Sequence, residues 1–330
     1  MKNIFENKDI LVTGGCGSIG SEIVKQLIKF NPKKIRVLDN NESNLFYLGQ
    51  ELKNKIIRLL IGDIRDRNRI YRATKDVDVV FHAAALKHVS LCEYNPFDAV
   101  STNIIGTENL VSACMDNDVA KFVGISTDKA VNPINTMGAT KLLSEKIITD
   151  TAISSLNTKF CCVRFGNVLD SVGSVVPIFK QQIKKGGPVT ITDRNMIRFF
   201  MTKFDAINLV LKAAEKTQGG EIFILKMKKL KIMDLAQAMI DEFAPKYGYN
   251  PKDIKYEFIG IRSGEKIDES LMNEEELNYA EDIGDMYVVR NRWGSNVEIR
   301  ANNHRSKMLK DVKFLNIEDI KEVLHESKIV

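Results

Sequence analysis

Residues 9–20 read Asp-Ile-Leu-Val-Thr-Gly-Gly-Cys-Gly-Ser-Ile-Gly. The apolar run at 10–12 is typical of a buried parallel strand, and glycines follow it at once. Further apolar side chains recur at 23, 24, 27 and 28, the spacing of a helix with one buried face. Strand, glycine-rich turn and helix in this order match the dinucleotide fingerprint, in which backbone N–H groups and the helix N-terminus bind a pyrophosphate. We therefore predict a dinucleotide site at the start of the chain.

The second predicted strand indicates which dinucleotide is bound. It ends at Asp39, about twenty residues after the last glycine, as the fingerprint expects. A carboxylate here accepts hydrogen bonds from the ribose hydroxyls of NAD and repels the 2′-phosphate of NADP, and no arginine follows it directly. The alternative is a simple turn residue, because Asn40 and Asn41 come next. We predict NAD as the cofactor.

Two later strands complete the predicted cofactor site. One closes on Asp63, which is placed to meet the adenine edge, and the other runs from 77 into the small residues 83–85. Small side chains let the backbone lie against a cofactor. His82, in the latter strand, is interpreted as a satisfied, semi-buried histidine. The predicted cofactor-binding residues are Gly14, Gly17, Ser18, Ile19, Gly20, Asp39, Asp63, Ile64, Ala83 and, from the helix described below, Lys141.

The 330 residues are enough for more than one domain and a large buried core. Predicted strands alternate with helices from residue 9 to about 165, which indicates a Rossmann-type, doubly wound parallel sheet. After residue 166 the alternation becomes irregular, with breaks at Pro177 and Pro188. We expect an α/β fold with an NAD-binding domain at 1–166 and a smaller, partly interleaved C-terminal α/β substrate domain at 167–330. Part of 190–225 is expected to return to the first domain.

Composition argues against several other classes of protein. The N-terminus lacks the apolar core of a secretory signal and no window approaches eighteen apolar residues, so we expect a cytoplasmic protein with no membrane partner. The five cysteines show no metal-ligand spacing, so no metal is predicted and a reducing compartment is expected. The net charge of +5 is dispersed and indicates no nucleic-acid binding. The densest basic run, 226–231, is predicted to be a solvated loop.

A polar stretch follows the predicted strand at 120–127. Asp128 and Lys129 come directly after it, at the sheet edge where open parallel sheets bind ligands. A helix is predicted from about residue 136 to 148, with Met137 and Lys141 four residues apart on one face. Each feature alone has an alternative: a surface lysine for Lys141, and a loop ion pair or helix cap for the acid and base. After a complete dinucleotide site, the combination favours a catalytic centre.

These motifs together resemble those of the extended short-chain dehydrogenases/reductases. Within that superfamily the chain closely resembles the nucleotide-sugar 4,6-dehydratases that act on activated N-acetylglucosamine and serve bacillosamine, pseudaminic acid, legionaminic acid and capsule sugars. The likeness runs from about residue 5 to 290 and is to the short soluble members, since larger relatives carry an N-terminal membrane region. It is carried by residues 13–20, 126–130, 132–141, 164–168, 198–202 and 260–266.

The resemblance implies an enzyme, a hydro-lyase with tightly bound NAD. Hydride leaves C4 of the hexose, water is lost across C5–C6, and hydride returns to C6 to give a 4-keto-6-deoxy sugar. By resemblance, Lys129 is the base at C5 and Asp128 is the acid that protonates the departing C6 hydroxyl. Lys141 is expected to hold the nicotinamide ribose, and Thr127 to hydrogen-bond the C4 hydroxyl or the developing oxyanion. A lysine base must be neutral for part of the time, which requires a depressed pKa.

Met137 departs from the wider superfamily, which carries tyrosine at this position. A thioether cannot take a proton from the C4 hydroxyl as tyrosine does. Some members of the dehydratase family also carry methionine here, so the departure does not argue against activity. The C4 base stays open among Asp128, Lys129 and a relayed water, and general-base help of this kind is worth roughly 10²–10⁴-fold.

The predicted substrate-binding residues are Lys87, His88, Asn167, Arg198, Arg262 and Glu265. The first two are expected to reach the sugar or the phosphates, and by resemblance Asn167 contacts the substrate. Arg262 and Glu265 resemble the pair that binds the diphosphate and the nucleotide ribose, where arginine offers bidentate hydrogen bonds. Their alternative is a surface turn, and the alternative for Arg198 is a structural ion pair.

Two other functions compete with the dehydratase. A nucleotide-sugar 4-epimerase shares the fold, but it relies on the tyrosine that is missing here and does not need an acid–base pair at 128 and 129. The other alternative is a non-catalytic, NAD-binding regulatory protein, against which an intact centre at 127–129 beside Lys141 argues. The nucleotide (UDP or GDP) and the configuration at C5 stay open. By resemblance we expect a homo-oligomer, a dimer or larger, formed through two helices that flank the sheet.

Overall fold

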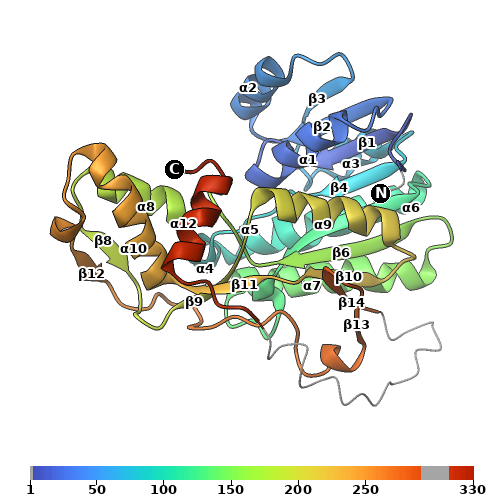
Figure 1. The fold of residues 1–330 in the computed structure, drawn as a ribbon. Helices are drawn as coiled ribbons and strands as arrows, with labels where there is room; N and C mark the ends of the chain where they lie inside the picture. Colours follow the sequence, from blue (N-terminus) through green and yellow to red (C-terminus); the bar gives the residue numbers. More distant parts are fainter. Residues whose placement is uncertain (1–2, 291–311) are drawn as a thin grey trace.

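A nine-stranded sheet in the order β13-β14-β10-β6-β5-β4-β1-β2-β3 forms the centre of the molecule (Figure 1). The structure, a computed structural model, describes residues 3–290 and 312–330. Neighbouring strands from β3 to β10 run parallel, whereas β14 is antiparallel to β10 and to β13. The strands are β1 (Asp9–Thr13), β2 (Lys34–Asp39), β3 (Ile57–Ile61), β4 (Val79–His82), β5 (Lys121–Thr127), β6 (Lys159–Phe165), β10 (Glu221–Leu225), β13 (Ala280–Asp282) and β14 (Met286–Val289).

Helices cover both faces of this sheet, and β1 shows why the sequence requires it. Ile10 and Val12 are buried in a core shared with α1, α2 and α9, whereas Leu11 is buried in a second core shared with α3, α6 and α7. A strand buried on both faces has a continuous apolar run. The predicted Rossmann-type, doubly wound sheet is therefore confirmed. These helices are α1 (Ser18–Ile28), α2 (Glu42–Leu52), α3 (Arg67–Thr74), α6 (Gly106–Asp116), α7 (Thr136–Ser154) and α9 (Lys203–Lys216).

A third hydrophobic cluster lies outside the main sheet, on the left of Figure 1. It is built around three helices and two small sheets, β11-β9-β7 and β12-β8. The chain returns to the main sheet with α9 and β10 between β9 and β11, so the two parts are interleaved. The elements are α8 (Val175–Lys184), α10 (Ile232–Phe243), α12 (Ile317–Glu326), β7 (Asn167–Val168), β8 (Val189–Ile191), β9 (Ile197–Met201), β11 (Lys228–Lys231) and β12 (Tyr256–Phe258).

The prediction of a solvated loop at 226–231 is wrong for its last four residues. They form β11, which pairs antiparallel with β9. Leu230 is buried while Lys228 and Lys231 are exposed, so the strand is only partly buried. The density of lysines concealed the strand in the sequence. Shorter helical segments are α4 (Val89–Tyr94), α5 (Pro96–Val100), η1 (Ser101–Ile105), η2 (Asp128–Ala130), η3 (Pro245–Tyr247), η4 (Pro251–Asp253) and η5 (Glu276–Asn278).

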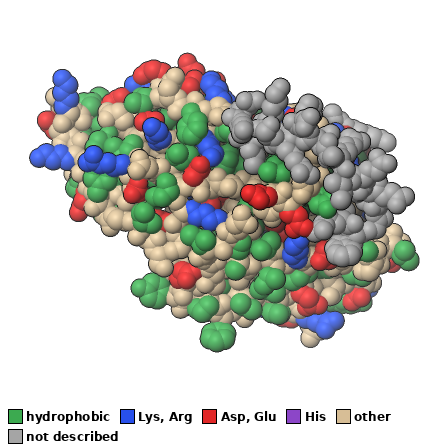
Figure 2. Space-filling model, turned by 90° about the horizontal axis from the view of Figure 1, so that it is seen from below, with side chains coloured by type: hydrophobic (Ala, Val, Ile, Leu, Met, Phe, Trp, Pro, Cys, Tyr) green, Lys and Arg blue, Asp and Glu red, His purple; other side chains and the backbone are tan. Residues whose placement is uncertain are grey.

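Charges of both signs are interspersed on the molecular surface. Figure 2 shows acidic and basic side chains among hydrophobic ones over the face seen from below. None of the helices described is both long enough and apolar enough to cross a membrane. Across 3–290 and 312–330, no group of three or more His, Cys, Asp or Glu side chains is arranged to hold a metal ion. All five cysteines are free thiols.

Candidate active site

A cavity of about 520 Å³ opens at the carboxyl ends of β1, β2 and β4. This is the edge at which doubly wound sheets bind their ligands. Ser18, Ile19 and Gly20 form the first turn of α1, directly after the glycine-rich turn. The structure thus brings most of the predicted cofactor residues together, with two of the predicted substrate residues beside them. The cavity is lined by Gly14, Gly17, Asp39, Asp63, Ile64, Ala83, Lys87 and His88, among others.

The close packing of this turn requires two of its glycines. Gly14 has a φ of +64°, and a Cβ there would lie 2.5 Å from the backbone nitrogen of Ala84. A Cβ on Gly20 would lie 2.1 Å from the carbonyl oxygen of Gly14. Neither position has room for a side chain, so the start of α1 packs directly onto the turn. The result is the backbone cradle that a dinucleotide pyrophosphate needs.

Two carboxylates stand at the rim of the cavity. The oxygens of Asp39 accept hydrogen bonds from the backbone N–H groups of Cys16 and Asn41, both at 3.0 Å, and so fix the glycine-rich turn. Burial and the nearby Asp39 raise the pKa of the Cys16 thiol to about 12, so it stays protonated at neutral pH. Asp63 pairs with Arg65 at 2.7 Å, and the hydrogen bond from Arg65 holds the pKa of Asp63 below its usual value.

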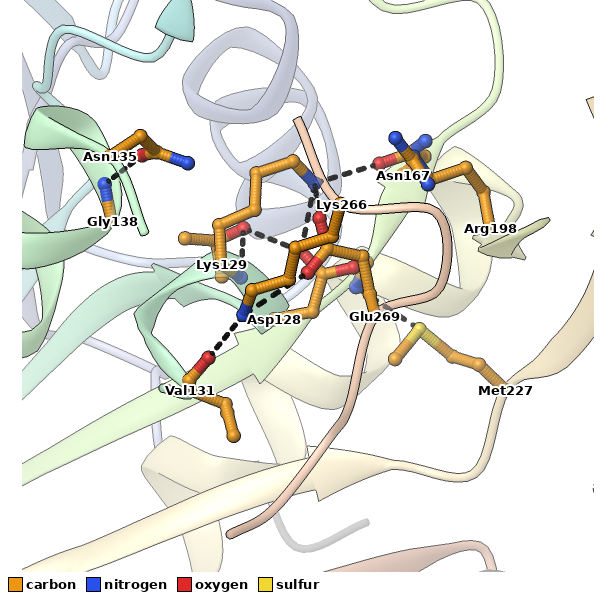
Figure 3. Close-up of polar contacts among 12 residues, drawn as sticks. Asp128, Lys129, Val131, Asn135, Gly138, Asn167, Arg198, Met227, Lys266 and Glu269 are labelled. Atoms are coloured by element: carbon orange, nitrogen blue, oxygen red, sulfur yellow. Dashed lines mark hydrogen bonds and ion pairs between the residues drawn. The ribbon is translucent and has the colours of Figure 1, made fainter. Parts of the chain in front are cut away.

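The acid–base residues meet where β5 ends. Thr127 is the last residue of β5, and the single 3-10 turn η2 follows it. Oδ1 of Asp128 accepts hydrogen bonds from Oγ1 of Thr127 and from Nζ of Lys129, both at 2.9 Å. Nζ of Lys129 also donates to Oδ1 of Asn167, on β7, at 3.2 Å (Figure 3). The structure therefore brings these four predicted residues into one hydrogen-bonded group.

One oxygen of Asp128 is left without a partner. The side chain is fully buried, and among the described residues no group hydrogen-bonds its Oδ2. A Cβ on Gly166 would lie 3.2 Å from this oxygen and 2.7 Å from Cβ of Phe199, so the glycine keeps the chain close without covering it. Because buried polar atoms are normally paired, an unpaired carboxylate oxygen at a sheet edge indicates an atom that meets a ligand.

Helix α7 places Lys141 behind this group. The helix begins after Asn135, whose side chain caps it by accepting a hydrogen bond from the N–H of Gly138 at 2.7 Å. Nζ of Lys141 donates to the carbonyl of Ile125 at 2.6 Å. Burial lowers the pKa of Lys141 from its usual value. Lys141 is thus fixed against the strand that ends at the acid–base residues.

Met137 lies one turn before Lys141, in apolar surroundings. It is 3 % exposed and belongs to a small cluster with Cys92 and Ala99, against which Val89 also packs. The cluster fixes the thioether between α7 and the short helices α4 and α5. Met137 therefore fills volume at the position where the wider superfamily has a hydroxyl.

His82 is a buried histidine with both ring nitrogens hydrogen-bonded. Nδ1 lies 2.8 Å from Oγ1 of Thr13, and Nε2 lies 3.0 Å from Oγ1 of Thr107. Burial, and to a lesser extent the charge of Lys141, lower the pKa of His82 to about 3. It is therefore neutral at physiological pH and joins β1, β4 and α6 beneath the cavity.

Lys87 and His88 lie against the loop that follows β7. Nζ of Lys87 donates to the carbonyl of Val172 at 2.7 Å, and a Cβ on Gly173 would lie 2.4 Å from the ring of His88. Burial lowers the pKa of both side chains. The two residues thus join the cofactor cavity to the second part of the molecule.

Arg262 and Glu265 lie in a turn next to Asn135. The N–H of Glu265 donates to the carbonyl of Arg262 at 3.1 Å, and Arg262 is exposed. The turn is tied to the start of α7, because Nδ2 of Asn135 donates to the carbonyl of Gly264 at 2.8 Å. The side chain of Arg262 is therefore accessible to a ligand, whereas Glu265 is half-buried.

Comparison with known proteins places this geometry in a family. The model for polysaccharide biosynthesis proteins matches residues 10–291. The chain belongs to this family, within the extended short-chain dehydrogenases/reductases. It is 56 % identical to an uncharacterized membrane protein of Methanocaldococcus jannaschii, over 99 % of this chain and 98 % of that protein. It spans about half the length of two longer relatives. The matched region is 46 % of CapD of Staphylococcus aureus and 48 % of EpsC of Bacillus subtilis.

Relatives with named activities are nucleotide-sugar dehydratases and epimerases. The chain is 40 % identical to a UDP-N-acetylglucosamine 4,6-dehydratase (inverting) of Campylobacter jejuni, over 87 % of this chain and 84 % of that one. It is 39 % identical to a UDP-glucose 4-epimerase of Rickettsia canadensis, over 97 % and 96 %. The crystal structure of Pen from Bacillus thuringiensis covers 99 % of both chains at 39 % identity, with a TM-score of 0.92.

A more distant structure shares the fold. DesIV, a dTDP-glucose 4,6-dehydratase of Streptomyces venezuelae solved with NAD and TYD, is 23 % identical, with a TM-score of 0.71 over 81 % of this chain and 89 % of that one. This chain therefore shares the Rossmann-type fold of a structure that was solved with NAD.

One buried carboxylate of the site was not predicted from the sequence. Glu269 is 4 % exposed, with Oε1 4.0 Å from Nζ of Lys129 and Oε2 3.8 Å from Nζ of Lys266 (Figure 3). In the sequence it follows Asp268 in a stretch rich in acidic residues, a composition typical of an exposed loop. The only local signal is the motif at 260–266 directly before it.

Two buried arginines hold the segment of residues 260–276 that carries Glu269. Arg198 is 8 % exposed, and its Nη1 donates to the carbonyl of Ile267 at 3.1 Å. Arg164 is fully buried and pairs with Glu145 of α7 at 2.6 Å and with Glu276 at 2.8 Å. Because Arg198 also donates to the carbonyl of Ile197, its hydrogen bonds join backbone groups of β9 and the 260–276 segment.

Proposed function

We propose that this chain is an NAD-dependent 4,6-dehydratase of a nucleotide-activated N-acetylglucosamine, a hydro-lyase that yields a 4-keto-6-deoxy sugar for surface glycans. The proposal is carried by the pair of Asp128 and Lys129, whose Oδ1 and Nζ lie 2.9 Å apart at the carboxyl end of β5. Loss of water across C5–C6 needs an acid for the departing oxygen and a base for the carbon-bound proton. The 40 % identical relative named as a UDP-N-acetylglucosamine 4,6-dehydratase supports it.

The cofactor cavity fits NAD. Gly14 and Gly20 leave no room for a Cβ, which allows a pyrophosphate to approach the backbone. Asp39 ends β2, where a ribose-binding carboxylate is expected. It accepts two backbone N–H groups, and since a carboxylate has about four lone-pair sites it retains capacity for ribose hydroxyls. When bound, NAD supplies an acceptor of hydride that can also return it within one turnover.

In this proposal two residues perform the proton transfers. Oδ2 of Asp128 takes the C4 hydroxyl proton as hydride leaves C4, while the Thr127 hydroxyl orients that oxygen. Lys129, as the neutral amine, removes the C5 proton that the C4 ketone has made acidic. Asp128 then gives its proton to the C6 hydroxyl, which departs as water, and Lys129 returns its proton to C5 when hydride reaches C6. Both residues end in the state in which they began.

This assignment leaves Met137 without a proton to transfer. Its packing with Cys92 and Ala99 supports that view, because the thioether occupies an apolar cluster. Lys141, fixed on the carbonyl of Ile125, would hold the nicotinamide ribose through its remaining N–H groups.

The remaining predicted residues bind the substrate in this proposal. Asn167 would contact the sugar, and Arg262 and Glu265 the diphosphate and the nucleotide ribose, with Lys87 and His88 beside the cofactor cavity. We expect residues 1–166 to serve mainly the cofactor and 167–330 mainly the nucleotide sugar, in a cytoplasmic homo-oligomer.

A nucleotide-sugar 4-epimerase is the second candidate function. It is favoured by the relative of Rickettsia canadensis, which is named a UDP-glucose 4-epimerase and aligns over 97 % of this chain. An epimerase returns hydride to C4 and needs no acid at C6. The buried acid–base pair and the methionine at 137 therefore favour the dehydratase.

Proton NMR in D₂O separates the two functions. The purified protein is incubated with UDP-N-acetylglucosamine and, separately, with the GDP sugar. We expect a new C6 methyl signal with deuterium at C5, whose couplings give the C5 configuration, and the sugar that reacts identifies the nucleotide. An equatorial-to-axial change at C4 without a methyl signal would mean an epimerase. An unchanged spectrum with both sugars, from protein that carries NAD, would contradict both enzymatic proposals.

A further inference from the structure

Glu269 differs from the two carboxylates that pair with Arg164. Glu145 and Glu276 both accept hydrogen bonds from that guanidinium. The side chain of Glu269 is 4 % exposed, against 16 % for Glu276, yet among the described residues its Oε2 has no hydrogen-bond partner. Since a purely structural carboxylate would be paired, the free oxygen indicates a role in the site itself.

The position of Glu269 is fixed from both sides along the chain. Before it, Nζ of Lys266 donates to the carbonyl of Val131 at 2.8 Å, and Arg198 donates to the carbonyl of Ile267. After it, Arg164 donates to the carbonyl of Leu271 at 3.0 Å. These contacts join the segment to Val131, directly after η2, and to β9 and β6. These contacts therefore hold the carboxylate of Glu269 beside Lys129.

Four charged groups face Glu269, and they come from three parts of the chain. Nζ of Lys129 and Nζ of Lys266 lie 4.0 and 3.8 Å from its oxygens, and Asp128 and Arg198 act on it electrostatically. Burial raises the pKa of Glu269, Asp128 raises it further, and the three cations oppose the rise. Lys129 in turn faces two carboxylates, one bonded at 2.9 Å and one at 4.0 Å.

We propose that Glu269 is a positioning residue of the acid–base centre: it supplies the second negative charge facing Lys129 and sets the pH range in which Lys129 accepts the C5 proton. This role rests on the dehydration proposed above. When the amine of Lys129 takes the proton from C5, the resulting ammonium stands between Asp128 and Glu269 until the proton returns to C5. Glu269 gains and loses no proton in this step, and its charge makes Lys129 the stronger base.

The test compares the pH dependence of kcat for Glu269→Gln with that of the wild type. Removing a negative charge about 4 Å from Nζ of Lys129 destabilises its ammonium form, so we expect the acid limb of the profile to move to lower pH by about one unit. The plateau rate should fall as well, because the amine becomes a weaker base. A lower plateau with an unmoved limb would overturn the proposal, because structural damage alone lowers the rate at every pH.

Two matched variants guard against a folding defect. Glu269→Asp keeps the charge, so its limb should stay within a few tenths of a pH unit of the wild type. Lys266→Gln removes a cation, so its limb should move to higher pH, opposite in sign to Glu269→Gln. The exposed neighbour Asp268, which pairs with Lys229, is the control: Asp268→Asn should leave the limb in place. Shifts of the same sign in Glu269→Gln and Lys266→Gln would contradict the electrostatic role.

A direct titration separates this inference from the proposed reaction. Competitive labelling of lysines with acetic anhydride, read at Lys129 by mass spectrometry, reports its protonation without turnover. We expect the midpoint to be lower in Glu269→Gln than in the wild type. If the midpoint shifts but the wild type forms no methyl product, the proposed function fails while the coupling stands. An unshifted midpoint in an active enzyme overturns the role of Glu269.

Discussion

The cofactor side and the acid–base side of the site are assembled in different ways. Around the dinucleotide cavity, the glycine-rich turn and Asp39 come from one strand-helix-strand unit of the chain. Around Lys129, the partners come from η2, from β7 and from the 260–276 segment, so that Glu269 lies far from Lys129 in sequence and 4.0 Å from it in space. One side is built mainly from local backbone geometry, and the other from side chains brought together by the whole fold.

The two sides of the site are therefore sensitive to different kinds of substitution. Cofactor binding depends on close backbone approach, so it is sensitive to added volume in the turn. Proton transfer depends on charges fixed by distant anchors, so it is sensitive to the loss of a partner. Single substitutions should therefore be able to impair cofactor binding and proton transfer separately.

The largest effect is expected for Asp128→Asn. An amide cannot take up and deliver the proton, so turnover should fall by roughly 10²–10⁴-fold or more. Because Asp128 lies on the acid–base side, NAD should remain bound. The methyl signal in the NMR assay and the NAD released on denaturation measure the two sides. Persistent turnover would show that the acid is another group.

A large loss of stability is expected for Arg164→Met. The change leaves the buried Glu145 and the half-buried Glu276 without their shared cation, and breaking a buried pair costs about 3–5 kcal/mol. Denaturant unfolding measures it. The control is Lys226→Ala, which removes an exposed pair with Asp282 and should cost at most about 1 kcal/mol. Equal losses in both variants would show that Arg164 does not anchor the 260–276 segment.

Gly20→Ala tests the cofactor side. Its methyl group would lie 2.1 Å from the carbonyl oxygen of Gly14, and overpacking of this kind costs about 1–3 kcal/mol. We expect a lower unfolding midpoint and a lower content of NAD. Gly17→Ala is the matched variant, because its methyl group would lie 3.3 Å from the same oxygen and its φ is −71°. Full NAD content in Gly20→Ala would refute the backbone cradle.

His82 makes stability depend on pH beneath the cofactor cavity. Its pKa is about 3 in the fold and 6.5 when unperturbed, so below pH 6.5 the unfolded chain binds a proton that the folded chain does not. Stability is therefore lost as pH falls, by about 2 kcal/mol between pH 6.5 and 5 from this residue. Urea unfolding at the two pH values should show a smaller loss in His82→Asn. An equal loss in both proteins would contradict the assignment.

The smallest effect is expected for Met137→Tyr. If Asp128 already takes the C4 proton, a phenol gives no new function, and it would place a hydroxyl in the apolar cluster with Cys92 and Ala99. The initial rate of methyl formation should rise by less than about tenfold, the lower end of general-base help being roughly 10²-fold. A larger gain would show that the C4 base is missing in the natural chain.

How much could be predicted from the sequence also differs between local features and contacts made across the fold. The apolar run before the glycine-rich turn, the spacing to Asp39 and the strand ends were local signals, and the doubly wound sheet built on them is confirmed. The polar stretch after β5 likewise marked Asp128 and Lys129. The pairing of β11 with β9 was not predicted, because lysines masked a half-buried strand.

Long-range contacts left no such signal. Nothing near Glu269 in the sequence distinguishes it from Asp268, which is exposed and pairs with Lys229. The difference arises because the 260–276 segment is held by carbonyl contacts from arginines that precede it by more than sixty residues in the chain. Because distant residues determine the burial of Glu269, it cannot be predicted from the residues next to it in the sequence.

The fully buried Arg164 has a consequence for exchanging parts between relatives. It is a single side chain that joins the helix carrying Lys141 to the segment carrying Glu269 through Glu145 and Glu276. If residues 260–276 are replaced by those of a relative, the new segment can keep its position only if it also carries a carboxylate that pairs with Arg164. Without one, the guanidinium would keep only its pair with Glu145, and the contact that anchors the segment would be lost. Recombination points in this family should accordingly keep residues 145, 164 and 276 from the same parent.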